Sequence, residues 1–139
     1  MPKPKLRHIA MSVDDPFATA DFYQKAFDME KVGETDSPLA RGVYLSDGTL
    51  CLAILHFKND YWAGSKEKEW TGIHHLGFWV DELDETHNMI ESSGGEYFSG
   101  RPDASAGDLT QTHFEVKYFD PNGVMVELSS NGWPGASRD

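Results

Sequence analysis

Residues 72–83, Gly-Ile-His-His-Leu-Gly-Phe-Trp-Val-Asp-Glu-Leu, decide the fold because a similar stretch occurs earlier in the chain. Residues 6–15 are Leu-Arg-His-Ile-Ala-Met-Ser-Val-Asp-Asp. The segment that begins at His75 aligns with the segment that begins at His8 position for position, at an offset of 67 residues (from 8 to 75). A repeat at a fixed spacing indicates that one chain holds two similar structural units.

Each copy of the repeat continues from a strand into a helix. The first helix is predicted at residues 16–28, with Asp15 as its N-cap, because an aspartate before a proline at the first helical position is a typical start. The second helix is predicted at about residues 82–93, where a glycine pair ends the pattern. Both units therefore begin in the order strand, helix.

The later part of each unit also repeats. A turn that contains Gly48 precedes one apolar run, and a turn that contains Gly123 precedes another, at an offset of 75 residues (from 48 to 123). We therefore expect half-modules at residues 5–57 and 72–130, joined by a linker at residues 58–71, in a single domain.

Period-two patterns and turn residues predict the strands. They are expected at residues 6–13, 29–34, 40–46, 49–57, 73–80, 95–98, 112–119 and 124–130. Two helices are too few to serve as the crossovers of a doubly wound parallel sheet. The predicted fold class is α+β, with two βαβββ modules whose curled mixed sheets enclose a cleft. Exposed sheet edges lead us to expect a homodimer.

Composition limits the classes of partner. The 139 residues suffice for one hydrophobic core, and no apolar run approaches the roughly 18 residues of a membrane span. A net charge of −11 disfavours nucleic acid and anionic lipid surfaces as partners.

No signal peptide is evident, so we expect a cytoplasmic location, and the single Cys51 excludes an intramolecular disulfide. The turn-rich tail is expected to fray beyond Trp133.

Three polar residues interrupt apolar strands in a related way: His8, His75 and Glu127. The two histidines occupy equivalent positions of the repeat, so a pseudo-twofold axis would bring them together beside the cleft. A buried carboxylate must be paired or coordinated. Two neutral imidazoles and one carboxylate form the facial triad that suits Fe(II) and related divalent ions.

Two structural alternatives compete with this metal site. Each strand histidine could be a hydrogen-bonded core residue, and Glu127 could be a buried ion-pair partner of Arg7 or Arg41. His74 adjoins His75, but neighbouring strand residues point to opposite faces, so we assign His74 a structural role.

The chain resembles the vicinal oxygen chelate superfamily, which includes glyoxalase I, methylmalonyl-CoA epimerase, extradiol dioxygenases, fosfomycin-resistance transferases and bleomycin-binding proteins. The resemblance covers residues 7–27, 72–95 and 118–129, and its most specific part is the turn Tyr-Phe-Asp-Pro-Asn-Gly before a strand with a glutamate. It implies paired βαβββ modules, usually in a dimer. It also implies that a divalent metal ion is bound by His8, His75 and Glu127.

One position departs from the glyoxalase pattern, in which the last strand of the first unit supplies a fourth ligand. Repeat register places Leu52 there, and leucine cannot bind a metal. His56 lies farther along the same predicted face and could be recruited by a bulge. The candidate catalytic residues are His56, His113 and Tyr118, and Tyr44 is also available, although none matches a dioxygenase motif.

The sequence therefore predicts a divalent-metal-dependent enzyme that acts on a small oxygenated substrate. With three ligands, the site is closest to the extradiol dioxygenase type, for which Fe(II) or Mn is favoured. A lyase or isomerase of the glyoxalase type, with Zn or Ni, is the alternative within the enzymes. A non-catalytic binding protein of the bleomycin-resistance type is the other alternative, although a pure binder has no need of a buried His/His/Glu set.

Overall fold

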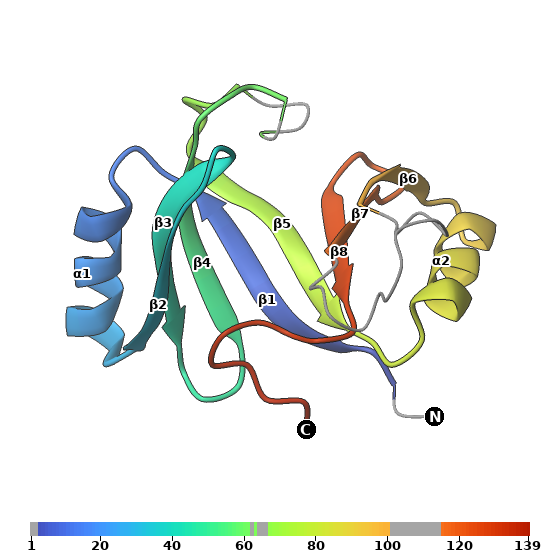
Figure 1. Cartoon of the computed structure of the whole chain (residues 1–139), viewed down its shortest axis with the longest axis horizontal. Coiled ribbons are helices and arrows are strands. Elements are labelled where there is room, and N and C mark those ends of the chain that lie inside the picture. The colour runs from blue at the N-terminus through green and yellow to red at the C-terminus, as the bar shows by residue number, and fades with distance from the viewer. Residues whose placement is uncertain (1–2, 62, 64–66, 101–114) are drawn as a thin grey trace.

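The computed structural model describes residues 3–61, 63, 67–100 and 115–139 of the chain (Figure 1). In chain order its elements are β1 (Lys5–Ser12), α1 (Pro16–Phe27), β2 (Glu30–Asp36), β3 (Ala40–Ser46), β4 (Cys51–Phe57), β5 (Gly72–Trp79), α2 (Leu83–Ser92), β6 (Glu96–Ser99), β7 (Val116–Phe119) and β8 (Met125–Ser129). Each half of the chain has the order βαβββ, and the predicted α+β class is confirmed.

The strands form one eight-stranded mixed sheet in the order β2-β3-β4-β1-β5-β8-β7-β6. Within each half, the first and last strands run parallel, as β1 with β4 and β5 with β8. The halves meet through an antiparallel pairing of β1 with β5 at the centre (Figure 1). The two curled sheets are thus continuous, because joining these two edges satisfies backbone groups that would otherwise lack partners.

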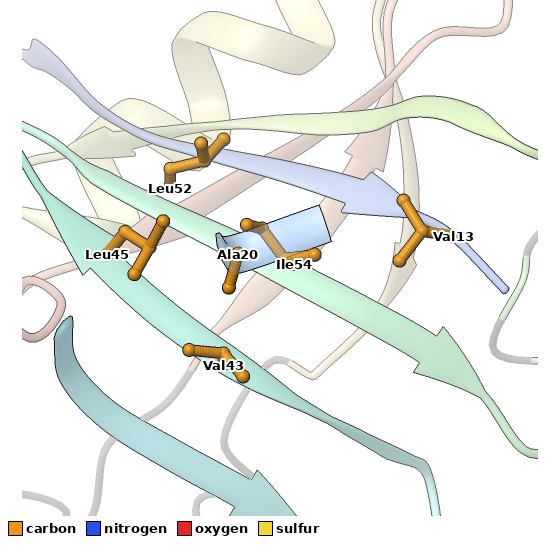
Figure 2. Packing of buried hydrophobic residues seen from close by; sticks show 6 residues of the cluster. All are labelled: Val13, Ala20, Val43, Leu45, Leu52 and Ile54. Carbon is orange, nitrogen blue, oxygen red and sulfur yellow. The ribbon is translucent and has the colours of Figure 1, made fainter. Parts of the chain in front are cut away.

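The two helices flank the sheet at its opposite ends (Figure 1). α1 begins where predicted, since the Asp15 side chain accepts hydrogen bonds from two backbone N–H groups of the first turn. It packs against β3 and β4 over a cluster of buried residues that Figure 2 shows: Val13, Ala20, Val43, Leu45, Leu52 and Ile54. α2 contributes Leu83 and Ile90 to a second cluster. Neither helix of the described chain is long and apolar enough to cross a membrane.

The C-terminal tail is held to the sheet well beyond Trp133, so the expectation that it frays there is wrong. The backbone N–H of Ser137 donates to the carbonyl oxygen of Thr49 at 2.9 Å. The carbonyl oxygen of Ser137 accepts from Nε of Arg7 at 2.6 Å. Arg138 forms an ion pair with Asp81 at 2.7 Å. Figure 1 shows the tail crossing β1 on its way towards the β3–β4 turn.

Candidate metal centre

The central strand pair brings the two repeat-related histidines together. In the β1–β5 register, His8 pairs with Gly77 and His75 pairs with Ala10, which is the reciprocal arrangement expected of a pseudo-twofold axis between the strands. Both imidazoles project to the same side of the sheet and are buried. Their Nε2 atoms lie 3.1 Å apart.

The third residue of the predicted triad, Glu127, reaches the same point from β8. It lies beside Gly77 in the parallel β5–β8 register, and its side chain has 0% exposed surface. Its Oε1 is 3.6 Å from Nε2 of His8, and its Oε2 is 3.2 Å from Nε2 of His75. One donor atom from each of the three residues lies within 4.8 Å of the others.

The chemistry of this donor set fits a divalent ion. Burial lowers the pKa of His8 from 6.5 to about 4 and lowers the pKa of His75 well below its ordinary value, so both imidazoles are neutral at pH 7. Neutral imidazole nitrogens are metal ligands. Within the described part of the chain, Oε1 of Glu127 is buried without a hydrogen-bond partner, which is costly for a polar atom. A divalent ion would coordinate this oxygen and accept the nitrogen lone pairs.

The charged partner of Glu127 is Lys117, which the sequence analysis missed. Lys117 lies opposite Glu127 in the β7–β8 register, and its Nζ is 3.0 Å from Oε2 of Glu127. The expectation of a buried ion pair is met, but the partners suggested for it are wrong: Arg7 binds backbone carbonyl oxygens, and Arg41 lies on β3, opposite Asp36 of β2. A usable signal was present in the sequence, because charged residues alternate with apolar ones along the strand that holds Lys117.

Glu115 is a second carboxylate beside the donor set. Its Oε2 is 3.8 Å from Nζ of Lys117, and its side chain, which is 43% exposed, lines the cavity described below. Burial, followed by the nearby charge of Glu127, raises the pKa of Glu115 to about 7. Burial lowers the pKa of Lys117, but Glu127 and Glu115 outweigh that effect and raise it. Lys117 therefore remains a cation.

The position equivalent to a fourth ligand is Ala53, so the assignment of Leu52 to it is wrong. Strand pairing relates Ala53 to Glu127, because β4 begins three residues after Gly48 whereas β8 begins two residues after Gly123. The repeat thus shifts by one residue at this turn. Leu52 packs in the core beside α1 (Figure 2), and Ala53 lines the cavity. The conclusion that this strand supplies no ligand there is unchanged.

Two of the candidate catalytic residues, His56 and Tyr118, lie away from this site. His56 is absent from the cavity lining, and its Nδ1 lies 3.1 Å from the carbonyl oxygen of Val13. Tyr118 is 1% exposed in the core beneath α2, with its hydroxyl 2.8 Å from Nδ1 of His87. His113 lies outside the described residues. Tyr44, in contrast, is placed in the cavity wall.

A cavity of about 520 Å³ opens from the three donor side chains and extends over β2, β3 and β4. This volume is within the range of small-molecule sites. Apart from the charged residues and the tail, its wall combines apolar side chains with hydroxyl-bearing ones: Thr35, Ser37, Leu39, Tyr44, Leu55 and Phe57. The cavity thus has a charged end and a mostly apolar body.

Trp133, from the tail, stacks on one of the two histidines. Its ring is parallel to that of His8 within 3°, with centroids 4.6 Å apart. Gly77 makes this stacking possible, because a Cβ there would lie 2.7 Å from Cβ of His8 and 2.9 Å from the indole of Trp133. The tail therefore forms part of the cavity wall, which the sequence analysis did not predict.

His74 and His75 both line the cavity, so the expectation that they face opposite sides is wrong. The β1–β5 register shifts between Ala10 and Met11, which places a β-bulge at His74. Nε2 of His74 is 2.9 Å from the carbonyl oxygen of Ala63, and Nδ1 of His74 is 2.8 Å from Nδ1 of His75.

Comparisons with known proteins agree with this architecture. A family model described as the Glyoxalase/Bleomycin resistance protein/Dioxygenase superfamily matches residues 5–128. Among solved structures, a hypothetical protein from Bacillus halodurans is 20% identical, with a TM-score of 0.72 over 92% of this chain and 94% of that chain. Methylmalonyl-CoA epimerase from Streptomyces coelicolor, in complex with 2-nitronate-propionyl-CoA, is 19% identical, with a TM-score of 0.70 over 90% and 92% of the two chains.

Methylmalonyl-CoA epimerase from Mycobacterium tuberculosis is also similar, at 18% identity and a TM-score of 0.67 over 89% of this chain and 85% of that one. At these identities, the likeness to solved structures shows the shared fold. No curated protein matches the sequence.

Proposed function

Since the chain belongs to the glyoxalase/bleomycin resistance protein/dioxygenase superfamily, we propose that it is a divalent-metal-dependent enzyme that acts on a small oxygenated substrate. In this proposal His8, His75 and Glu127 hold one ion. The observation that carries it is the convergence of three buried donors within 4.8 Å at the end of a cavity of small-molecule size.

The bound ion would supply Lewis acidity towards substrate oxygens. Three protein ligands leave coordination positions for a substrate with two neighbouring oxygens, and this ligand set is typical of sites for Fe(II) or Mn, with Zn or Ni as alternatives. The remaining chemistry belongs to the side chains around the ion.

Lys117 is suited to bind a negatively charged substrate oxygen beside the metal. Its Nζ lies at the charged end of the cavity, 3.0 Å from Oε2 of Glu127, and its side chain is 17% exposed. In a site of low dielectric, a fixed cation stabilises charge that develops on an oxygen. The apolar wall across the cavity would hold the body of the substrate and exclude water from it.

Within the enzymes, the extradiol dioxygenase type is the first candidate. It is supported by the absence of a ligand at Ala53, which leaves the donor set at three residues. The second candidate is a lyase or isomerase of the glyoxalase type. It is supported by Glu115, whose carboxylate faces the cavity beside the donors and could accept a substrate proton. The epimerase fold of the solved structures is consistent with the second candidate.

One pair of assays tests these candidates. The protein is purified without oxygen and its metal content measured; dioxygen uptake is then recorded with simple catechols, and deuterium exchange into methylmalonyl-CoA is recorded in deuterium oxide. We expect metal-dependent turnover in one assay, and its loss in the Glu127→Gln variant. Uptake of dioxygen would identify the first candidate, and exchange without uptake the second.

A different result would contradict the enzyme proposal. If the metal-loaded protein bound catechols or other aromatic compounds tightly but converted none of them, the non-catalytic binding protein would be the better description. Three further expectations stay predictions: the homodimer, the cytoplasmic location and the half-module bounds at residues 5–57 and 72–130. Light scattering tests the first of them.

A further inference from the structure

We infer that His74 is a positioning residue that fixes the tautomer of His75 and so directs the Nε2 lone pair of His75 towards the metal position. The inference rests on the proposed function to the extent that His75 is a metal ligand. It goes further in assigning a role to a histidine that neither the superfamily membership nor the donor set accounts for. One chain of contacts supports it, from Ala63 through His74 to His75.

The first contact fixes the proton on His74. A carbonyl oxygen can only accept, so Nε2 of His74 must donate to the oxygen of Ala63, 2.9 Å away. His74 is only 5% exposed, and the ring of Phe57 lies 4.4 Å from it between centroids. A neutral imidazole carries one proton, so neutral His74 has a lone pair on Nδ1.

The second contact fixes the proton on His75. Nδ1 of His74 accepts, so the 2.8 Å contact requires Nδ1 of His75 to donate. A neutral imidazole carries one proton, which leaves Nε2 of His75 as a lone pair. That atom is the one that lies 3.1 Å from Nε2 of His8 and 3.2 Å from Glu127. The metal-binding tautomer of His75 is thus set before any ion arrives.

A local backbone irregularity makes this arrangement possible. In a regular strand, neighbouring side chains point to opposite faces, and His74 could not reach the ring of its neighbour from the cavity side. The bulge in the β1–β5 pairing turns both rings to one side, with their planes at 77° and their centroids 5.1 Å apart. Bulges commonly redirect a side chain next to a functional site.

The other histidine of the donor set is held differently. Nδ1 of His8 is buried and has no hydrogen-bond partner within the described part of the chain, and the ring is placed by stacking on Trp133. The ring of His75 is therefore held by a hydrogen bond to His74, whereas the ring of His8 is held by stacking. A hydrogen bond to the outer nitrogen of a ligating histidine orients the ring and raises its basicity, and losing such a partner typically costs 10- to 100-fold in affinity, as an order of magnitude.

Two substitutions separate positioning from packing. His74→Phe keeps a ring against Phe57 but removes both nitrogens. His74→Asn is the matched control, because its amide oxygen can still accept a hydrogen bond from Nδ1–H of His75. The first measurement is the imidazole tautomer of His75 in the metal-free protein, from long-range ¹H–¹⁵N correlations. The second is the affinity for Zn²⁺ and Ni²⁺ by competition with a chelator.

We expect the wild type and His74→Asn to carry the proton of His75 on Nδ1, and His74→Phe to lose that preference. Metal affinity should fall about 10- to 100-fold in His74→Phe and recover in His74→Asn. A wild-type proton on Nε2 of His75, equal affinity in His74→Phe, or failure of His74→Asn to recover would each overturn the inference.

The proposed function and the role of His74 can be contradicted separately. If the wild type bound no metal, the proposed function would fail, whereas the tautomer in the metal-free protein would still decide the role of His74. If His74→Phe did not fold, the wild-type tautomer and the His74→Asn affinity would provide the test.

Discussion

At the scale of single residues, the candidate metal centre contains a charged side chain, Lys117, that would compete with a bound metal ion for the carboxylate of Glu127. Lys117 shares the carboxylate of Glu127 with the proposed ion, since Nζ lies 3.0 Å from Oε2. A cation at this distance weakens the attraction of the site for a second cation, but it strengthens the attraction for an anionic substrate. Lys117 should therefore have opposite effects on the two kinds of ligand.

The Lys117→Met substitution tests this balance. We expect the divalent ion to bind more tightly, by roughly tenfold, because a nearby like charge is removed from a site of low dielectric. Oxalate, used as a small anionic chelating probe, should bind the metal-loaded variant more weakly than the wild type. Titration calorimetry measures both affinities. Unchanged oxalate affinity would contradict the proposed role of Lys117 in anion binding.

A second residue, Cys51, should be chemically silent in the folded protein. Its side chain is 0% exposed, and burial raises the pKa of its thiol to about 12. A raised pKa lowers the thiolate fraction at pH 8, and the thiolate is the reactive form. We expect a disulfide reagent such as dithionitrobenzoate to react with Cys51 only after denaturation. Equal reaction rates with and without denaturant would show that the strand is open to solvent.

At the scale of elements, the repeat predicted much of what positions the site. The alternation of β1 places His8 in the cavity wall and Ile9 in the core against α1. The features that were not predicted are departures from regular structure. The bulge at His74 depends on pairing across the two halves, and the one-residue shift at Ala53 depends on the length of a turn. Neither leaves a periodic pattern in the sequence.

The tail was missed for a different reason. Its composition is typical of a loop, and its order comes from long-range contacts such as the stacking of Trp133 on His8 and the hydrogen bond from Ser137 to Thr49. Local propensity carries no information on such contacts. The donors themselves were found because polar residues are conspicuous in apolar strands, whereas Lys117 and Glu115 lie in a strand of mixed character.

Trp133→Ala tests the contribution of the tail to the metal centre. Trp133 is 7% exposed, so truncation should lower the free energy of unfolding by roughly 3 to 5 kcal/mol. It should also weaken metal binding, because His8 loses the ring that holds its plane. Trp133→Phe, which retains an aromatic face, is the control and should bind metal more tightly than Trp133→Ala. Chemical denaturation and chelator competition measure these effects. Equal metal affinity in the two variants would argue against this role.

At the scale of the whole molecule, the site exists because two half-modules share one sheet. His8 belongs to the first half, and His75 and Glu127 belong to the second, so an ion bound by all three would link the halves across β1 and β5. A ligand that binds only the folded state stabilises it. Metal binding should therefore raise the unfolding temperature of the chain as a single cooperative unit.

The most direct test of the central claim is the metal content of the wild type and of Glu127→Gln after equilibration with Fe²⁺, Mn²⁺, Zn²⁺ or Ni²⁺. We expect about one tightly held ion per wild-type chain for at least one of these metals. Glu127→Gln should bind that ion more than about 100-fold more weakly, since even loss of an outer partner costs up to that factor. Its metal-free unfolding midpoint should fall only modestly, because the amide oxygen can still accept from Lys117 and the carboxylate of Glu115, 3.8 Å from Nζ of Lys117, can balance that cation. Wild-type protein that binds no metal, or a variant that keeps its metal while its unfolding midpoint falls, would contradict the account.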